Sequence, residues 1–174
     1  MGDEVWYATI VGVIVLSGLI IFSIFYLAKM RRTKTNAAWK QAATELGLDF
    51  TPVTRIFGKY RMSGVIGKQL SCSVWAYTEP NAQGGYATFM NYDVRFSQPL
   101  NKVKELLTPN IQSKLLEVNN VLKKVVVSDD SVNSTRMSGF IRKSEILVQN
   151  VKLLIQLAEL IIPNEEVDSI FEEI

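Results

Sequence analysis

The chain has 174 residues and a formal net charge of +2, which leaves room for one domain and indicates no nucleic-acid partner. It contains no histidine, the residue that most often serves as general base, zinc ligand or axial ligand of haem and chlorophyll-type pigments. Its one cysteine, Cys72, cannot form a disulfide within the chain. We therefore expect no cofactor, no metal site, no small-molecule substrate and no catalytic residues, so that the protein is not an enzyme.

An uncharged run of 24 residues from Val5 to Ala28 predicts a single transmembrane helix. At ~1.5 Å per residue, a helix of this length crosses the roughly 30 Å of bilayer hydrocarbon. Aromatic residues that favour the membrane interfaces stand at its two ends: Trp6, Tyr7, Phe25 and Tyr26. A cleaved signal peptide is the alternative, but the residues before the run are acidic and no small-residue cleavage site follows it.

Basic residues follow the uncharged run directly and predict its orientation: Lys29, Arg31, Arg32 and Lys34. The positive-inside rule then places residues 1–4 outside the cytoplasm and the chain from residue 29 inside it. Within the run, Ala8 and Gly12 have the spacing of a helix-packing face, although ordinary glycine usage in membrane helices is the favoured explanation.

A short juxtamembrane helix is predicted within residues 29–47, after the basic flank. Asn36 has a side chain suited to cap its start, and Gly47 is suited to end it. Trp39, Ala42 and Ala43 recur at helical spacing, which predicts an apolar face that packs on the domain.

Three strands are expected next, over residues 60–66, 69–78 and 86–97, with Gly67 and Lys68 as a two-residue hairpin turn. Alternation divides each strand into two faces. The apolar face carries Leu70, Cys72, Val74, Ala76, Met90, Tyr92, Val94 and Phe96, and the other carries Ser71, Ser73, Trp75, Tyr77, Asn91, Asp93 and Arg95. Trp75 and Tyr77 suit a stacking platform for single-stranded nucleic acid, but we favour an outer face covered by the helix at residues 37–46.

The second half of the chain predicts a helix, a hairpin and a longer helix. Thr108 and Pro109 start the first helix, which has an apolar stripe of Ile111, Leu115, Leu116 and Val118 and runs to about residue 122. The hairpin pairs residues 125–128 with 132–138. The last helix covers about residues 142–162, and its five polar residues between 146 and 162 argue against a second membrane span. We expect an α+β domain over residues 48–162, built of antiparallel hairpins packed with two or three helices.

No sequence motif in the domain predicts catalysis. The segment GVIGKQ at residues 64–69 has too few residues between its glycines for a phosphate-binding loop and is read as a hairpin turn. Asp129 and Asp130 are adjacent and fit a solvated turn better than a carboxylate pair. Cys72 falls on the apolar face, so we expect a buried, unreactive thiol.

The end of the chain, residues 163–174, is an acidic tail with five acids and no base. Its apolar residues have the spacing of one helix face, and they are candidates for docking on a partner subunit or on the domain itself: Val167, Ile170, Phe171 and Ile174. A frayed, solvated end is the alternative.

Three segments resemble a group of uncharacterised bacterial membrane-anchored proteins: AAWKQAATELGLDFTP, GKYRMSGVIGKQLSCSVW, and LLTPNIQSKLLEV leading into VVVSDDSVNSTRMSGF. The resemblance implies the fold and a bacterial setting, and no activity. Together with the predicted anchor and its orientation, this setting leads us to expect a location in the inner membrane. From the lone anchor and the missing ligand residues we expect a non-catalytic accessory or scaffold subunit of a larger membrane complex, such as a respiratory or photosynthetic assembly. A membrane-tethered adaptor that recruits a soluble cytosolic partner is the alternative.

Overall fold

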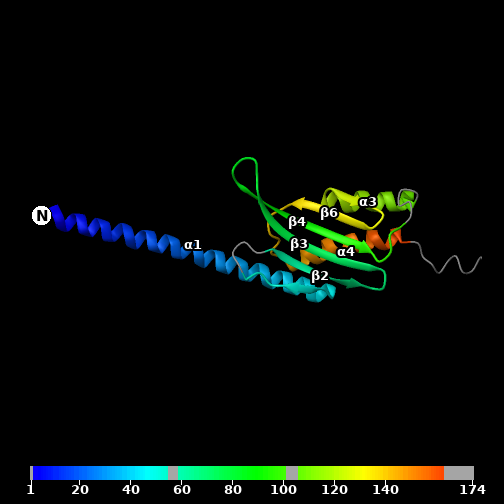
Figure 1. Ribbon diagram of the computed structural model, residues 1–174, viewed down its shortest axis with the longest axis horizontal. Helices are drawn as coiled ribbons and strands as arrows, with labels where there is room; N and C mark the ends of the chain where they lie inside the picture. The colour runs from blue at the N-terminus through cyan, green and yellow to red at the C-terminus, as the bar shows by residue number, and fades with distance from the viewer. Residues whose placement is uncertain (1, 55–58, 101–105, 163–174) are drawn as a thin grey trace, which may run out of the picture.

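The computed structural model describes residues 2–54, 59–100 and 106–162 and has an α+β fold: a long helix followed by a compact domain (Figure 1). The helices are α1 (Gly2–Leu46), α3 (Pro109–Leu122) and α4 (Ser144–Ile161). The strands are β1 (Asp49–Thr51), β2 (Tyr60–Ile66), β3 (Leu70–Pro80), β4 (Tyr86–Phe96), β5 (Val125–Val127) and β6 (Ser131–Met137).

Helix α1 is continuous from the uncharged run into the domain, which corrects the prediction of a separate juxtamembrane helix. Asn36 lies inside the helix and caps nothing, because its side chain is bonded to Val53. Thr33 and Thr35 also keep their hydroxyls on the helix, donating to the carbonyls of Lys29 and Arg31. The basic flank is therefore helical, and Gly47, with a φ of +67°, ends α1 as predicted.

All six strands form one antiparallel sheet in the order β1-β2-β3-β4-β6-β5. Pairing of β4 with β6 joins the two predicted hairpins into a single sheet. Two predictions were wrong in detail. The β2–β3 turn holds three residues, since Ile66 pairs with Leu70. The short edge strand β1, which pairs with β2, was not predicted.

The three helices pack on one face of the sheet, the face that carries Met62, Val74 and Met90. Helix α4 lies behind the central strands in Figure 1, between the end of α1 and α3. Leu147, Leu154 and Leu157 of α4 are fully buried, so it is a core helix. Leu116 of α3 is exposed, although it was predicted to belong to an apolar stripe. Among the described residues, α1 is the one helix long and apolar enough to cross a membrane.

Candidate functional site

The face of the sheet opposite the helices is left uncovered by the described residues, and we call it the open face (Figure 1). The strand registers place its side chains in rows that cross the sheet. It consists of Arg61, Ser63 and Val65 of β2, Ser71, Ser73, Trp75 and Tyr77 of β3, Phe89, Asn91, Asp93 and Arg95 of β4, and Asn133, Thr135 and Met137 of β6.

The prediction that residues 37–46 cover Trp75 and Tyr77 is wrong. The Trp39 ring packs against Phe50 and Tyr60, at centroid distances of 6.5 and 5.5 Å. Tyr60 pairs with Ala76, so both lie on the face opposite Trp75. The predicted alternation was correct, but helix α1 packs on the apolar set of side chains and leaves the aromatic set uncovered.

Aromatic and long apolar side chains gather at one end of the open face. Tyr77 and Phe89 are cross-strand partners and stack with their ring centroids 5.5 Å apart. Met137 pairs with Phe89 in the same row and is 69% exposed. Trp75, two residues before Tyr77, is half-buried. These side chains form a partly solvated surface, and contact with a partner would remove it from water.

Polar groups occupy the centre of the open face. Asn91 and Asp93 are buried, although no helix lies over them. The Asp93 carboxylate accepts from Nε of Arg95 at 2.7 Å, and the Arg95 side chain is 65% exposed. The Asn91 amide oxygen accepts from the Thr135 hydroxyl, but Asn91 Nδ2 has no hydrogen-bond partner among the described residues. An unpaired buried donor of this kind lowers the stability of the fold.

The arrangement offers two kinds of group for binding: cationic side chains at Arg61 and Arg95, and aromatic rings. Within the described residues, no three His, Cys, Asp or Glu side chains are grouped to hold a metal. Cys72 is buried on the opposite face, and its burial, followed by the charge of Asp93, raises the pKa of the thiol to about 12. The buried thiol that the sequence predicted is confirmed.

No family model matches the chain, and no curated protein or solved structure is significantly similar to it.

The turns predicted to carry no chemistry are turns in the structure. Gly67 lies in the β2–β3 turn with a φ of +62°. Asp129 and Asp130 are exposed between β5 and β6, and the Asp130 carboxylate accepts from the Ser128 hydroxyl at 2.7 Å. Both segments are therefore turns, as predicted.

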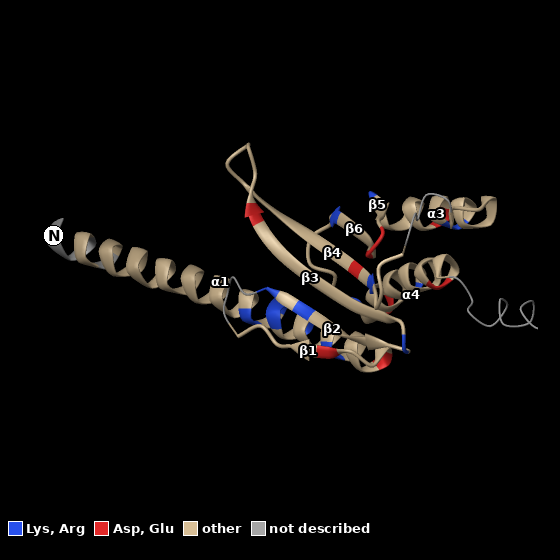
Figure 2. Cartoon of the chain, turned by 45° about the vertical axis from the view of Figure 1, so that its right-hand side comes forward, with Lys and Arg blue, Asp and Glu red and all other residues tan. Residues whose placement is uncertain are grey.

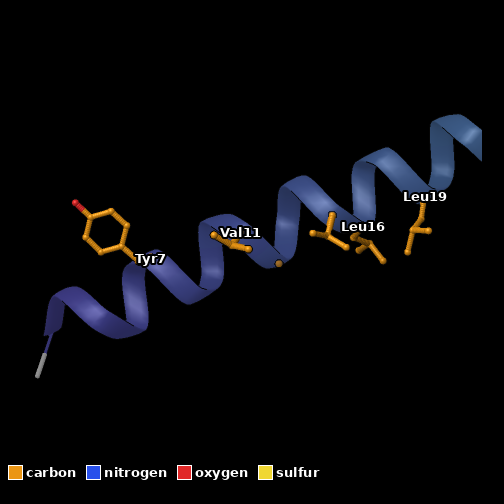
Figure 3. A pocket seen from close by; sticks show the side chains of 6 residues that line it. Tyr7, Val11, Leu16 and Leu19 are labelled. Carbon is orange, nitrogen blue, oxygen red and sulfur yellow. The ribbon is translucent and has the colours of Figure 1, made fainter.

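The residues predicted for the membrane lie along α1. Trp6, Tyr7, Phe25 and Tyr26 are exposed on the helix, as are Lys29, Arg31 and Lys34, while Arg32 is half-buried against the domain. Figure 3 shows Tyr7, Val11, Leu16 and Leu19 around a shallow hollow beside Gly12. The tail candidates Val167, Ile170, Phe171 and Ile174 lie outside the described residues, and their docking stays a prediction.

Three members of the open face were not singled out from the sequence: Phe89, Met137 and the unpaired amide of Asn91. If the two strands pair outward from the loop at residues 81–85, Phe89 lies opposite Tyr77. This contact could therefore have been predicted from the sequence. Met137 depends on the pairing of β4 with β6, two strands separated by a helix and β5, which no local pattern specifies.

Proposed function

We propose that this protein is a non-catalytic, single-pass accessory subunit of a larger bacterial membrane complex, which binds a protein partner through the open face. The observation that carries the proposal is a sheet with three helices on one side and none of the described residues packed on the other. A one-sided antiparallel sheet is common, but its free face is then usually polar. Here it holds Trp75, Phe89 and Met137.

The composition of the open face supports a protein partner. Aromatic residues, methionine and arginine are the types enriched at the centre of protein interfaces, and Trp, Tyr and Arg dominate binding energy.

The charges on the open face favour protein over single-stranded nucleic acid. Arg61 and Arg95 lie on it, but Asp93 is buried between the strands and is bonded to Arg95. A phosphate backbone requires a continuous basic surface, because each contact is an ion pair made in water. A buried carboxylate at the centre of the face disfavours such a ligand.

The same polar centre favours the second candidate function, an adaptor that recruits a soluble cytosolic partner and releases it. Interfaces of permanent complexes resemble a divided apolar core, whereas those of dissociating complexes keep polar groups. Asn91, Asp93 and Arg95 at the centre of the open face match the second kind. Salt distinguishes the two, since a partner held through Arg95 dissociates as ionic strength rises.

The test compares two exposed apolar residues on opposite faces of the domain. Met137 lies on the open face and is 69% exposed, and Leu116 lies on α3 and is 66% exposed. The full-length chain carries an affinity tag and is purified from its own membranes in mild detergent. We expect Met137→Asp to lose a co-purifying partner, at least tenfold, and Leu116→Asp to retain it. Equal retention by both variants contradicts the proposal.

The proposed location is the inner membrane, with the domain in the cytoplasm. Lys29, Arg31 and Lys34 support this orientation, because they follow the uncharged run on an exposed helix. An enzyme reporter that works only after export, fused after Ile174, is expected to stay silent. Reporter activity at that position would reverse the proposed topology.

A further inference from the structure

A cavity of about 680 Å³ lies where α1 enters the domain, between the helix and the segment before α4. The residues of α1 that line it lie on both sides of Ala28, where the uncharged run ends. On the membrane side of that boundary the wall is apolar and consists of Ile24, Phe25, Leu27 and Ala28. On the domain side it is cationic and consists of Lys29, Arg31 and Arg32. Figure 2 shows Lys and Arg gathered on this stretch of α1.

The opposite wall, contributed by the domain, adds a fourth cation. Arg142 lines the cavity together with Phe140 and Tyr60, and no acidic residue lines it among the described residues. Arg32 is held in place, since its Nη1 donates to the Thr54 carbonyl at 2.8 Å. The side chains of Lys29, Arg31 and Arg142 have no hydrogen bond or ion pair to the described part of the chain. The cavity therefore concentrates positive charge that lacks a counter-ion there.

Two buried side chains, Thr35 and Tyr60, also line the cavity. The Thr35 hydroxyl donates to the Arg31 carbonyl at 3.0 Å. Burial raises the pKa of Tyr60, while the charges of Arg32 and Arg142 act in the lowering direction. Arg32 of α1 and Arg142 of the segment before α4 line the same cavity.

The position of the cavity along α1 decides which ligand it suits. Residues before Ala28 are at the depth of the acyl chains, and the charges from Lys29 onward are at the depth of the headgroups. The β3–β4 hairpin projects from the end of the domain at which α1 enters it (Figure 1). A soluble phosphate would use the cations but leave the apolar wall exposed, whereas a phospholipid uses both.

We infer that this cavity binds an anionic phospholipid of the adjacent leaflet, with its phosphate between the cations of α1 and Arg142 and an acyl chain along Ile24 and Phe25. Arginine pairs with phosphate through two parallel hydrogen bonds, which favours Arg142 as the main contact from the domain. The bound lipid joins the anchor to the domain and fixes the height of the domain above the bilayer.

The experiment uses the full-length chain in a neutral detergent, titrated with phosphatidylglycerol or phosphatidylcholine and examined by native mass spectrometry. We expect phosphatidylglycerol to bind more tightly than phosphatidylcholine. Arg142→Gln should weaken phosphatidylglycerol binding about tenfold, the loss of one charge-assisted contact. Lys143→Gln is the matched control, since Lys143 is the exposed neighbour of Arg142 and does not line the cavity. Arg142→Lys should restore part of the affinity, because lysine keeps the charge but cannot form the two parallel hydrogen bonds.

Three results would overturn the inference. The first is equal binding of the two lipids to the wild-type chain. The second is an equal loss of affinity in Lys143→Gln and Arg142→Gln, which would show a general attraction of the basic surface. The third is release of phosphatidylglycerol by millimolar inorganic phosphate, which would identify a phosphate site that does not use the apolar wall. An unchanged melting temperature of Arg142→Gln separates lost binding from lost folding.

Discussion

Asn36 of α1 and Val53, just after β1, exchange two hydrogen bonds through the Asn36 side chain. Nδ2 of Asn36 donates to the Val53 carbonyl at 3.1 Å, and the Val53 amide donates to Oδ1 at 3.2 Å. One turn earlier, Arg32 donates to the Thr54 carbonyl. The Asn36 side chain thus bonds the backbone N–H and C=O of Val53, as a neighbouring strand would do. These two bonds connect α1 to the segment that follows β1.

The first prediction removes this pair of bonds. Asn36→Ala leaves both backbone groups of the buried Val53 without a partner, so we expect the free energy of unfolding to fall by about 1–3 kcal/mol. Asn36→Asp keeps the acceptor for the Val53 amide but places a carboxylate oxygen against the Val53 carbonyl, so it should also lower stability. Gln41→Ala is the control, an exposed residue of the same helix. Chemical denaturation of the full-length chain in detergent measures all three, and equal stability of Asn36→Ala and Gln41→Ala would refute the prediction.

The second prediction concerns alkaline pH. Burial raises the pKa of Cys72 from 9.0 to about 12, so the folded state keeps a proton that the unfolded state loses. This contribution to stability is complete below pH 9 and is lost as the pH rises from about 9 to about 12. It can reach about 1.4 kcal/mol per pH unit.

Cys72→Ala removes this dependence and leaves the other titrating groups in place. We therefore expect the stability of the wild-type chain to fall more steeply between pH 8 and about 10.5 than that of Cys72→Ala. The slope is the quantity compared, because the substitution also opens a small cavity that lowers stability at every pH. Parallel slopes in denaturant titrations would show that the thiol is accessible or ionised in the folded protein.

Local patterns predicted the strands and helices of the domain, with the exception of the short edge strand β1. The Thr108-Pro109 pair places the start of α3 at the residue observed, and Thr108 caps it by accepting from the Ile111 amide. Alternation predicted the two faces of β3 and β4, because a strand with one face in a core must carry its apolar residues at every second position. These features depend on neighbouring residues alone.

Features set by distant contacts were not predicted. The Asn36 side chain is of a type that caps helices. In the structure it bonds to Val53 instead, and this distant contact leaves no signal in the sequence. Trp39, Ala42 and Ala43 have the spacing of a helix that packs on the sheet. No pattern in α1 shows which face of the sheet this helix covers. The open face and the basic cavity both follow from that choice of face, so neither could be derived from the sequence.

The third prediction tests a buried polar contact of the core. Asn150 of α4 donates to the Tyr92 hydroxyl of β4 at 2.9 Å, and both side chains are buried. Tyr92→Phe leaves the Asn150 amide without this acceptor, and we expect a loss of about 1–3 kcal/mol. Adding Asn150→Leu removes the unpaired donor and should recover part of that loss. A double-mutant cycle by thermal unfolding measures the coupling, and additive effects would mean that the contact contributes nothing.

The last prediction concerns the boundary between anchor and domain. The apolar stretch of α1 is not buried in the described structure, whereas the part from Thr35 to Ala43 belongs to the core. A chain that begins at Thr33 keeps that part, including Trp39, whose Nε1 donates to the Ile141 carbonyl at 3.2 Å. We expect this chain to be soluble without detergent and to unfold cooperatively.

A chain that begins at Gly47 is the matched control. It lacks Trp39, Ala42 and Ala43, which are at most 1% exposed, and it should fail to fold because one wall of the core is missing. Circular dichroism and size-exclusion chromatography compare the two chains. If the chain from Thr33 is folded but aggregates, the exposed Ile146 and Leu160 of α4 are the next candidates for an interface. If it is unfolded, the membrane span itself stabilises the domain, and α1 acts as one structural unit from the bilayer to the sheet.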